Sequence, residues 1–201
     1  MTTYNSSLTP MPNNTPFDII NQTQSGNDEV LISGITSNSE FFINILSNDS
    51  YFYFSEAGTT DNITKAYTVT NHPTDKVLIA ALSDDGASQN LILARIISDN
   101  TLDTTLGGDG IISIDFANFD STDVNITALA NGKILISGYK NNDLVLTRYN
   151  ADGSLDTGFN GGDPITTDIG GLEKSYNINL QSDGKILVTG ERDNDLIIIR
   201  Y

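Results

Sequence analysis

The sequence predicts an all-β fold built from one repeated unit. Residues 131–149 and 183–201 are identical at 10 of 19 aligned positions without a gap, and equivalent residues such as Lys133 and Lys185 lie 52 positions apart. A repeat of this length indicates a supersecondary unit that is used several times. The apolar runs within it are short, rich in β-branched residues and bounded by Gly, Asn and Asp, which favours strands over helices.

The third copy of the unit shows the strands most clearly. Residues 134–136 form an unbroken apolar run, and residues 144–149 form a second run after a polar turn. Because successive residues are apolar, both strands are expected to be buried on both faces of a sheet. An Asp-Gly turn at residues 152–153 and a glycine-rich stretch precede a short strand near residues 165–169, and the next copy opens with residues 176–180. About four strands per unit are typical of a propeller blade.

Two earlier copies are weaker but legible. In the second copy, residues 76–79 match the first strand and residues 91–95 match the next one. The first copy is the weakest, with candidate strands at residues 29–34 and 41–46. We therefore expect a small β-propeller, or an open propeller segment, of about four blades.

Three motifs in these units resemble a known repeat. Residues 183–190 read D-G-K-I-L-V-x-G, residues 196–201 read L-x-x-x-R-Y, and residues 152–159 read D-G-x-L-D-x-x-F. This pattern resembles the delta-60 repeat of bacterial proteins. The resemblance implies a β-propeller-like fold in a large, often surface-associated or secreted protein, and it brings no catalytic signature. It therefore implies an extracellular or cell-surface location, with the export route left open.

The N-terminal end predicts a strand that can be exchanged between subunits. An extended arm, residues 1–24, precedes the four-repeat domain of residues 25–201, and its prolines disfavour helix. The arm contains a candidate assembly strand, formed by Phe17, Asp18, Ile19 and Ile20.

The C-terminal end predicts an acceptor for such a strand. The fourth copy ends before a D-G-x-L-D tail, so an open blade edge is expected there. Its residues are Leu196, Ile197, Ile198, Ile199 and Tyr201. The arm can close this edge in its own chain or extend the sheet of a neighbouring copy, head to tail, and the second route builds rings or filaments.

Arginine and aspartate recur at fixed positions of the unit. Arg95, Arg148 and Arg200 are equivalent, and Asp103 and Asp156 each stand eight residues after their arginine. We expect the structural ion pairs Arg95–Asp103 and Arg148–Asp156, because a guanidinium and a carboxylate can pin the turn to the strands.

Composition narrows the choice of partners. The chain has 26 acidic and 10 basic residues and a formal charge of −16, so phosphate backbones and anionic membrane surfaces would be repelled. Cysteine is absent, which excludes disulfides and thiolate metal sites. No apolar run approaches the roughly 20 residues that span a bilayer, and the N-terminal residues lack the features of a signal peptide. We expect neither nucleic-acid binding nor membrane insertion.

Candidate chemistry is sparse. The single histidine, His72, lies in an Asn-His-Pro turn context, and no G-x-S-x-G elbow accompanies it, so we expect no catalytic residues. We expect no cofactor either, with calcium as the alternative, because Asp152, Asp156 and Asp163 surround glycine-rich turns. The EF-hand pattern is absent, and the asparagine of one glycosylation sequon is Asn125.

These observations leave three functional readings. The leading one is a non-enzymatic structural protein that assembles with its own copies into a filament or lattice. The alternative is a monomeric propeller that recognises a glycan, a calcium ion or a protein, through the loop of residues 83–90 or the aromatic residues 51–54. The third is a carboxylate-dependent hydrolase, since acidic side chains stand in many turns.

Overall fold

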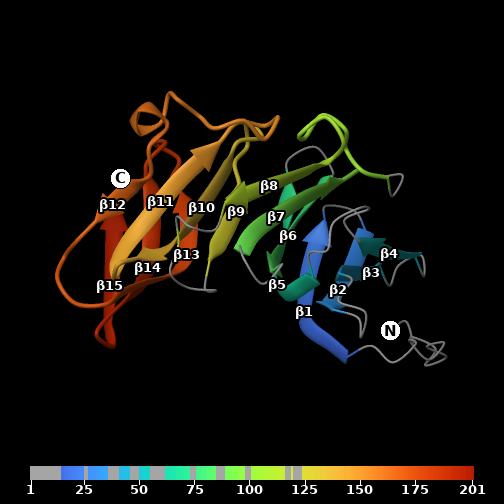
Figure 1. Cartoon of the computed structure of the whole chain (residues 1–201), viewed down its shortest axis with the longest axis horizontal. Helices are drawn as coiled ribbons and strands as arrows, with labels where there is room; N and C mark the ends of the chain where they lie inside the picture. The colour runs from blue at the N-terminus through green and yellow to red at the C-terminus, as the bar shows by residue number, and fades with distance from the viewer. Residues whose placement is uncertain are drawn as a thin grey trace.

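A computed structural model of the chain describes residues 15–24, 27–35, 41–45, 50–54, 62–72, 76–84, 89–97, 101–115, 119 and 124–201. The fold is all-β, and its strands form four antiparallel sheets (Figure 1). In every sheet the strands stand side by side in chain order, which is the arrangement of a propeller blade. Within the described ranges, no helix has the length and apolar character needed to cross a membrane.

The first two sheets have four strands each. The first sheet consists of β1 (Thr15–Gln24), β2 (Asn27–Ile35), β3 (Phe41–Ile45) and β4 (Ser50–Phe54). The second sheet consists of β5 (Asn62–His72), β6 (Lys76–Asp84), β7 (Gln89–Ile96) and β8 (Ile111–Asp115).

The last two sheets differ in strand number. The third has four strands, namely β9 (Asn125–Ala128), β10 (Ile134–Lys140), β11 (Asp143–Tyr149) and β12 (Ile165–Thr167). The fourth has three, namely β13 (Glu173–Leu180), β14 (Ile186–Arg192) and β15 (Asp195–Arg200). A short 3-10 turn, Asn160–Gly162, lies between β11 and β12.

The four sheets follow one another as an open segment of a propeller. Consecutive sheets contact each other through β2 and β5, β5 and β9, and β10 and β13. Figure 1 places the first sheet at one end of the long axis and the fourth sheet at the other. The expected fold class is therefore confirmed, and the described strands of the first and fourth sheets lie apart, as in an open propeller segment.

The third sheet is buried on both faces, as its continuous apolar runs predict. Ile136 and Val145 belong to the core shared with the second sheet, whereas Leu135 and Leu146 belong to the core shared with the fourth. Because side chains alternate between the faces of a strand, one apolar run supplies two cores. The hydrophobic pattern of a single unit thus positions both of its neighbours.

Two-residue turns join β10 to β11 and β14 to β15. Asn141 and Asn142 have φ angles of 53° and 74°, and Asp193 and Asn194, at equivalent positions, have 51° and 76°. A two-residue turn with positive φ at both positions matches the right-handed twist of the flanking strands, and Asn and Asp tolerate this conformation. Asp143 is consequently held at the first position of β11.

The N-terminal assembly strand has a different place from the one expected. Phe17, Asp18, Ile19 and Ile20 all lie in β1, which pairs with β2 of its own chain. Ile19 pairs with Ile32 and Ile20 with Leu31, while the register shifts between Pro16 and Asp18. Only two residues separate β1 from β2, so this pairing needs a short loop closure, whereas the open blade edge is far away in sequence. Residues 15–24 of the expected arm therefore form a strand of the first sheet, while residues 1–14 lie outside the described ranges.

Candidate functional site: the open face of the fourth blade

Two equivalent charge clusters tie the long turns to their blades. In the second blade, Asp103 Oδ2 lies 2.7 Å from Arg95 Nε and 2.6 Å from Lys76 Nζ. Arg95 is buried, and its Nη2 also donates to Thr105 Oγ1 at 2.9 Å. Burial alone raises the pKa of Asp103, but hydrogen bonds from Lys76, Thr105 and Arg95 outweigh this and hold the pKa well below its ordinary value. The carboxylate is therefore charged at neutral pH.

The third blade repeats this cluster with more exposure to solvent. Asp156 Oδ2 lies 2.5 Å from Arg148 Nε and 2.7 Å from Lys133 Nζ. The hydrogen bond from Lys133, followed by that from Arg148, lowers the pKa of Asp156 against the opposing effect of burial. The Arg148 guanidinium also lies 4.4 Å from the centre of the Phe159 ring. The repeat pattern predicts each arginine–aspartate pair, whereas the recurring lysine is recognised as a member of the cluster only in the structure.

The charge cluster of the second blade also connects this blade to the third. Arg95 Nη1 donates to Ala151 O at 2.7 Å, and Gly107 N donates to Asp152 O at 2.9 Å. Both acceptors belong to the Asp-Gly turn of the third unit. The arginine thus pins its own turn and also supports the next turn along the row.

The fourth blade exposes the face whose equivalent in the third blade is buried. Leu144 and Leu146 of β11 are fully buried, in the core that includes Ile178 of β13. The residues 52 positions later are Leu196 and Ile198 of β15, which are 79% and 63% exposed. The same repeat position is therefore buried at the junction of the third and fourth blades and exposed on the outer face of the fourth, among the blades that the structure describes.

The predicted edge residues are divided between the two faces of β15. Ile199 and Tyr201 pack against the core between the third and fourth sheets, and Ile197 is half-buried. The Tyr201 hydroxyl lies 2.6 Å from Thr167 Oγ1 of β12. Leu196 and Ile198, already described, are the two that face away from this core.

The same strand also has a backbone edge with which no described strand pairs. In the third sheet, β11 is hydrogen-bonded to β10 on one side and to β12 on the other. In the fourth sheet, β15 pairs with β14, and no strand among the described residues lies on its other side. An exposed row of N–H and C=O groups next to exposed apolar side chains is a ready surface for association.

Other sequence candidates do not converge on a site. His72 is the last residue of β5, and its partner in the register is Lys76. Residues 51–54 lie in β4, while residues 85–88 of the longer turn lie outside the described ranges. The sequon residue Asn125 donates its Nδ2 to Ser175 O at 2.7 Å, so its amide is used between the third and fourth blades.

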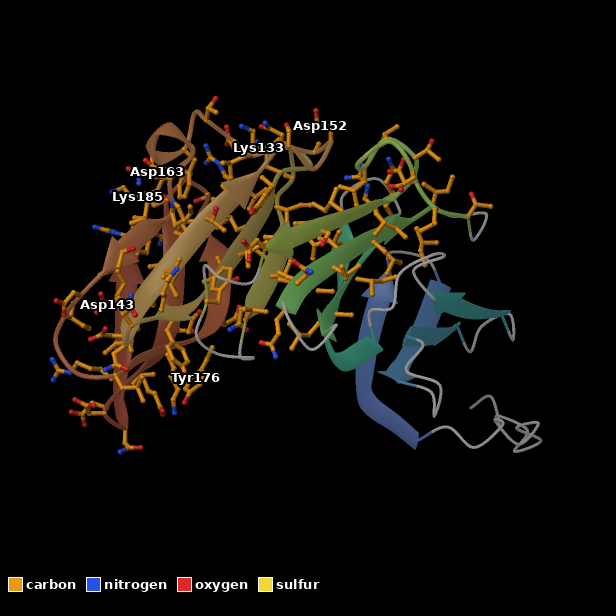
Figure 2. All side chains as sticks on the ribbon, viewed as in Figure 1. Lys133, Asp143, Asp152, Asp163, Tyr176 and Lys185 are labelled. Atoms are coloured by element: carbon orange, nitrogen blue, oxygen red, sulfur yellow. The ribbon has the colours of Figure 1, made fainter. Side chains whose placement is uncertain are left out.

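The aspartates expected to surround calcium have other roles. Asp156 forms ion pairs with Lys133 and Arg148, as described. The Asp152 carboxylate accepts hydrogen bonds from Ser154 N and Oγ. In the described part of the chain, one group of three acidic side chains has the spacing of a metal site, and it consists of Asp143, Asp168 and Glu173. Figure 2 shows Asp143 toward the opposite end of the blades from Asp152 and Asp163.

Comparison with known proteins bears on the same two blades. A family model described as a domain of unknown function (DUF5122) beta-propeller matches residues 129–159 and 181–201. These stretches contain β10 and β11 with their following turn, and β14 and β15. The chain is β-propeller-like. No curated protein matches the chain.

Proposed function

We propose that this propeller segment is a non-enzymatic scaffold that assembles head to tail, its open fourth blade packing against the first blade of another copy. The exposure of Leu196 and Ile198, set against the burial of Leu144 and Leu146, carries the proposal. At the junction of the third and fourth blades, the equivalent face packs against another blade. The resemblance to the delta-60 repeat adds an extracellular or cell-surface setting.

The first blade supports the choice of partner. It has the same four-stranded, antiparallel arrangement as the second and third blades, and Figure 1 places it at the end of the row opposite to the fourth blade. A contact between the two ends is heterologous, because each copy offers two different surfaces. Such contacts build a ring where the rotation closes and a filament where it does not.

This route differs from strand exchange through the N-terminal segment. Since β1 is paired with β2, it would have to leave its own blade before it could complete a neighbour's edge. Packing of whole blades needs no such opening. The buried equivalents, Leu144 and Leu146, show that side chains at these positions can be fully enclosed by another sheet.

Two lysine substitutions test the apolar face. Covering Leu196 and Ile198 would contribute about 2–4 kcal/mol, so Leu196→Lys with Ile198→Lys should weaken association by roughly 30- to 700-fold. The matched control is Leu155→Lys, because Leu155 is a partly exposed apolar residue in a turn of the third blade. Light scattering coupled to size-exclusion chromatography, with negative-stain microscopy, measures the assembly across a concentration series.

The expected result is a concentration-dependent series of oligomers for the full chain and the control, and a monomer for the double variant. Circular dichroism checks that the double variant keeps its strands. A full chain that stays monomeric at the highest soluble concentration contradicts the proposal. Assembly that the double variant retains contradicts the assignment of the face.

A further inference from the structure

Three carboxylates meet where the third and fourth blades join. Asp143 begins β11, Asp168 follows β12, and Glu173 begins β13. One carboxylate oxygen from each lies within 4.8 Å of the other two. Two residues thus come from the third blade and one from the fourth, at the end of the blades away from the long turns, as the label of Asp143 shows (Figure 2).

Glu173 is the unusual member of this group. It is fully buried, and neither of its carboxylate oxygens accepts a hydrogen bond. Burial raises the pKa of Glu173, and the charges of Asp143, Asp168 and Asp193 raise it further. The nearby backbone of Ile169 opposes this shift, although no hydrogen bond of normal geometry forms. A buried carboxyl group without a partner is costly, so it needs either a proton or a cation.

The arginine opposite Glu173 on the adjacent strand does not form an ion pair with it. Arg192 is opposite Glu173 in the register of β13 and β14. Its Nη1 donates to Ile169 O at 3.3 Å, and its buried Nε has no hydrogen-bond partner. Arg192 and Glu173 therefore lie on adjacent strands without forming an ion pair.

Backbone contacts hold the acidic group in place. Glu173 N donates to Asn142 O at 2.8 Å, which fixes the start of β13 against the tight turn before Asp143. Gly170 N donates to Asp168 Oδ1 at 2.8 Å and orients that carboxylate. Ligands fixed by strands and tight turns are pre-organised for binding.

We propose that Asp143, Asp168 and Glu173 bind one calcium ion, which ties the fourth blade to the third. Calcium takes oxygen ligands at 2.3–2.6 Å, so two oxygens on one ion can be up to about 5 Å apart. The whole spacing of the group fits within that limit. Magnesium holds its ligands at 2.0–2.1 Å, so opposite ligands span about 4.2 Å, and it usually keeps several waters. Calcium is thus the better fit to three protein carboxylates.

The site is specific to this junction within the described residues. The repeat position of Asp143 is Asn90 in the second unit, while Asp115 stands at the position of Asp168. In the fourth unit the equivalent of Asp143 is Asp195, which is exposed. Among the residues whose burial is described, only the junction of the third and fourth blades combines this aspartate with a buried glutamate.

The test measures calcium binding and stability on the full chain after chelator treatment. Isothermal titration with CaCl2 gives the affinity, and thermal unfolding gives the shift in Tm. At calcium 100-fold above Kd, the Tm of the unmodified protein should rise by about 5–10 °C. MgCl2 at the same concentration should produce a markedly smaller shift.

Two variants and one control locate the ion. Glu173→Gln should abolish the shift and, without calcium, should be at least as stable as the unmodified protein, because it removes a buried carboxyl group that needs a proton or a cation. Asp168→Asn should weaken calcium binding. Because Asp168 is exposed, this variant tests the site even if Glu173→Gln perturbs folding. Asp163→Asn, an exposed acidic residue outside the group, should leave binding unchanged.

The outcomes that overturn the proposal are distinct. No heat and no Tm shift at millimolar calcium would mean that Glu173 is simply protonated. Unchanged binding in both Glu173→Gln and Asp168→Asn would place the ion elsewhere. An equal or larger shift with MgCl2 would overturn the choice of calcium. None of these results bears on head-to-tail assembly, which is measured separately.

Discussion

The two equivalent charge clusters allow the cost of breaking a buried ion pair to be measured twice in one protein. Asp103→Asn and Asp156→Asn are the same substitution at the same repeat position, but the arginines differ in exposure. The side chain of Arg95 is 2% exposed and that of Arg148 is 23% exposed. Loss of the carboxylate therefore leaves a buried charge in the second blade and a hydrated one in the third.

The expected magnitudes follow from this difference. Removing one partner of a buried pair costs about 3–5 kcal/mol, and Asn keeps one acceptor oxygen, so we expect about 3 kcal/mol for Asp103→Asn. For Asp156→Asn, where Arg148 can reach water and Lys133 is 29% exposed, we expect about 1 kcal/mol. At 2–4 °C per kcal/mol in a chain of this size, the decreases in Tm are about 6–12 °C and about 2–4 °C.

Urea unfolding followed by far-ultraviolet circular dichroism at pH 7 measures both free energies, and Asp163→Asn serves as an exposed control. Equal losses for the two variants, or a larger loss for Asp156→Asn, would refute the argument that burial of the arginine sets the cost. An unchanged stability for Asp156→Asn would remove the support for its ion pair with Arg148.

Two further predictions concern acid and packing. Because the pKa of Asp103 is held below its ordinary 3.8, the folded state binds fewer protons than the unfolded chain. Asp103 therefore contributes its full stabilisation above about pH 5 and loses it as pH falls. The free energy of unfolding should accordingly decrease less steeply with falling pH in Asp103→Asn than in the unmodified protein. Gly190→Ala should destabilise by about 2–4 kcal/mol, since its Cβ would overlap the backbone carbonyl of Lys174. At the equivalent Gly138 the added Cβ would meet the Phe119 ring, which can shift, so Gly138→Ala should cost less by urea unfolding.

The repeat predicted the fold because local and long-range signals agree within one unit. Residues 134–136 and 144–149 are strands, and their continuous apolar character matches burial on both faces of the third sheet. The first blade shows where this reasoning fails. Its opening strand, β1, lies before the region where the repeat can be aligned, so the repeat pattern predicts a separate arm there. Pairing with β2 across two residues is a local contact that the repeat pattern does not reveal.

The group of three acidic residues could not be predicted from the sequence, because its members are far apart along the chain. Asp143 stands 25 residues before Asp168, and the three ligands belong to two different units. Their proximity depends on how the start of β13 meets the β10–β11 turn, through the hydrogen bond from Glu173 to Asn142. The clustering of Asp152, Asp156 and Asp163 along the chain predicts calcium at a different place. In the structure, Asp156 pairs with Lys133 and Arg148 instead.

Burial in this fold is a property of the junction between units, and sequence identity alone does not determine it. Leu144 and Leu196 occupy the same repeat position, and one is fully buried while the other is 79% exposed. A unit that encodes two apolar faces stays unsatisfied at whichever end lacks a neighbour. Polar residues usually cover the terminal faces of repeat proteins, whereas β15 carries exposed apolar residues like those buried in an interior blade. This apolar character makes another blade, rather than solvent, the expected partner of Leu196 and Ile198.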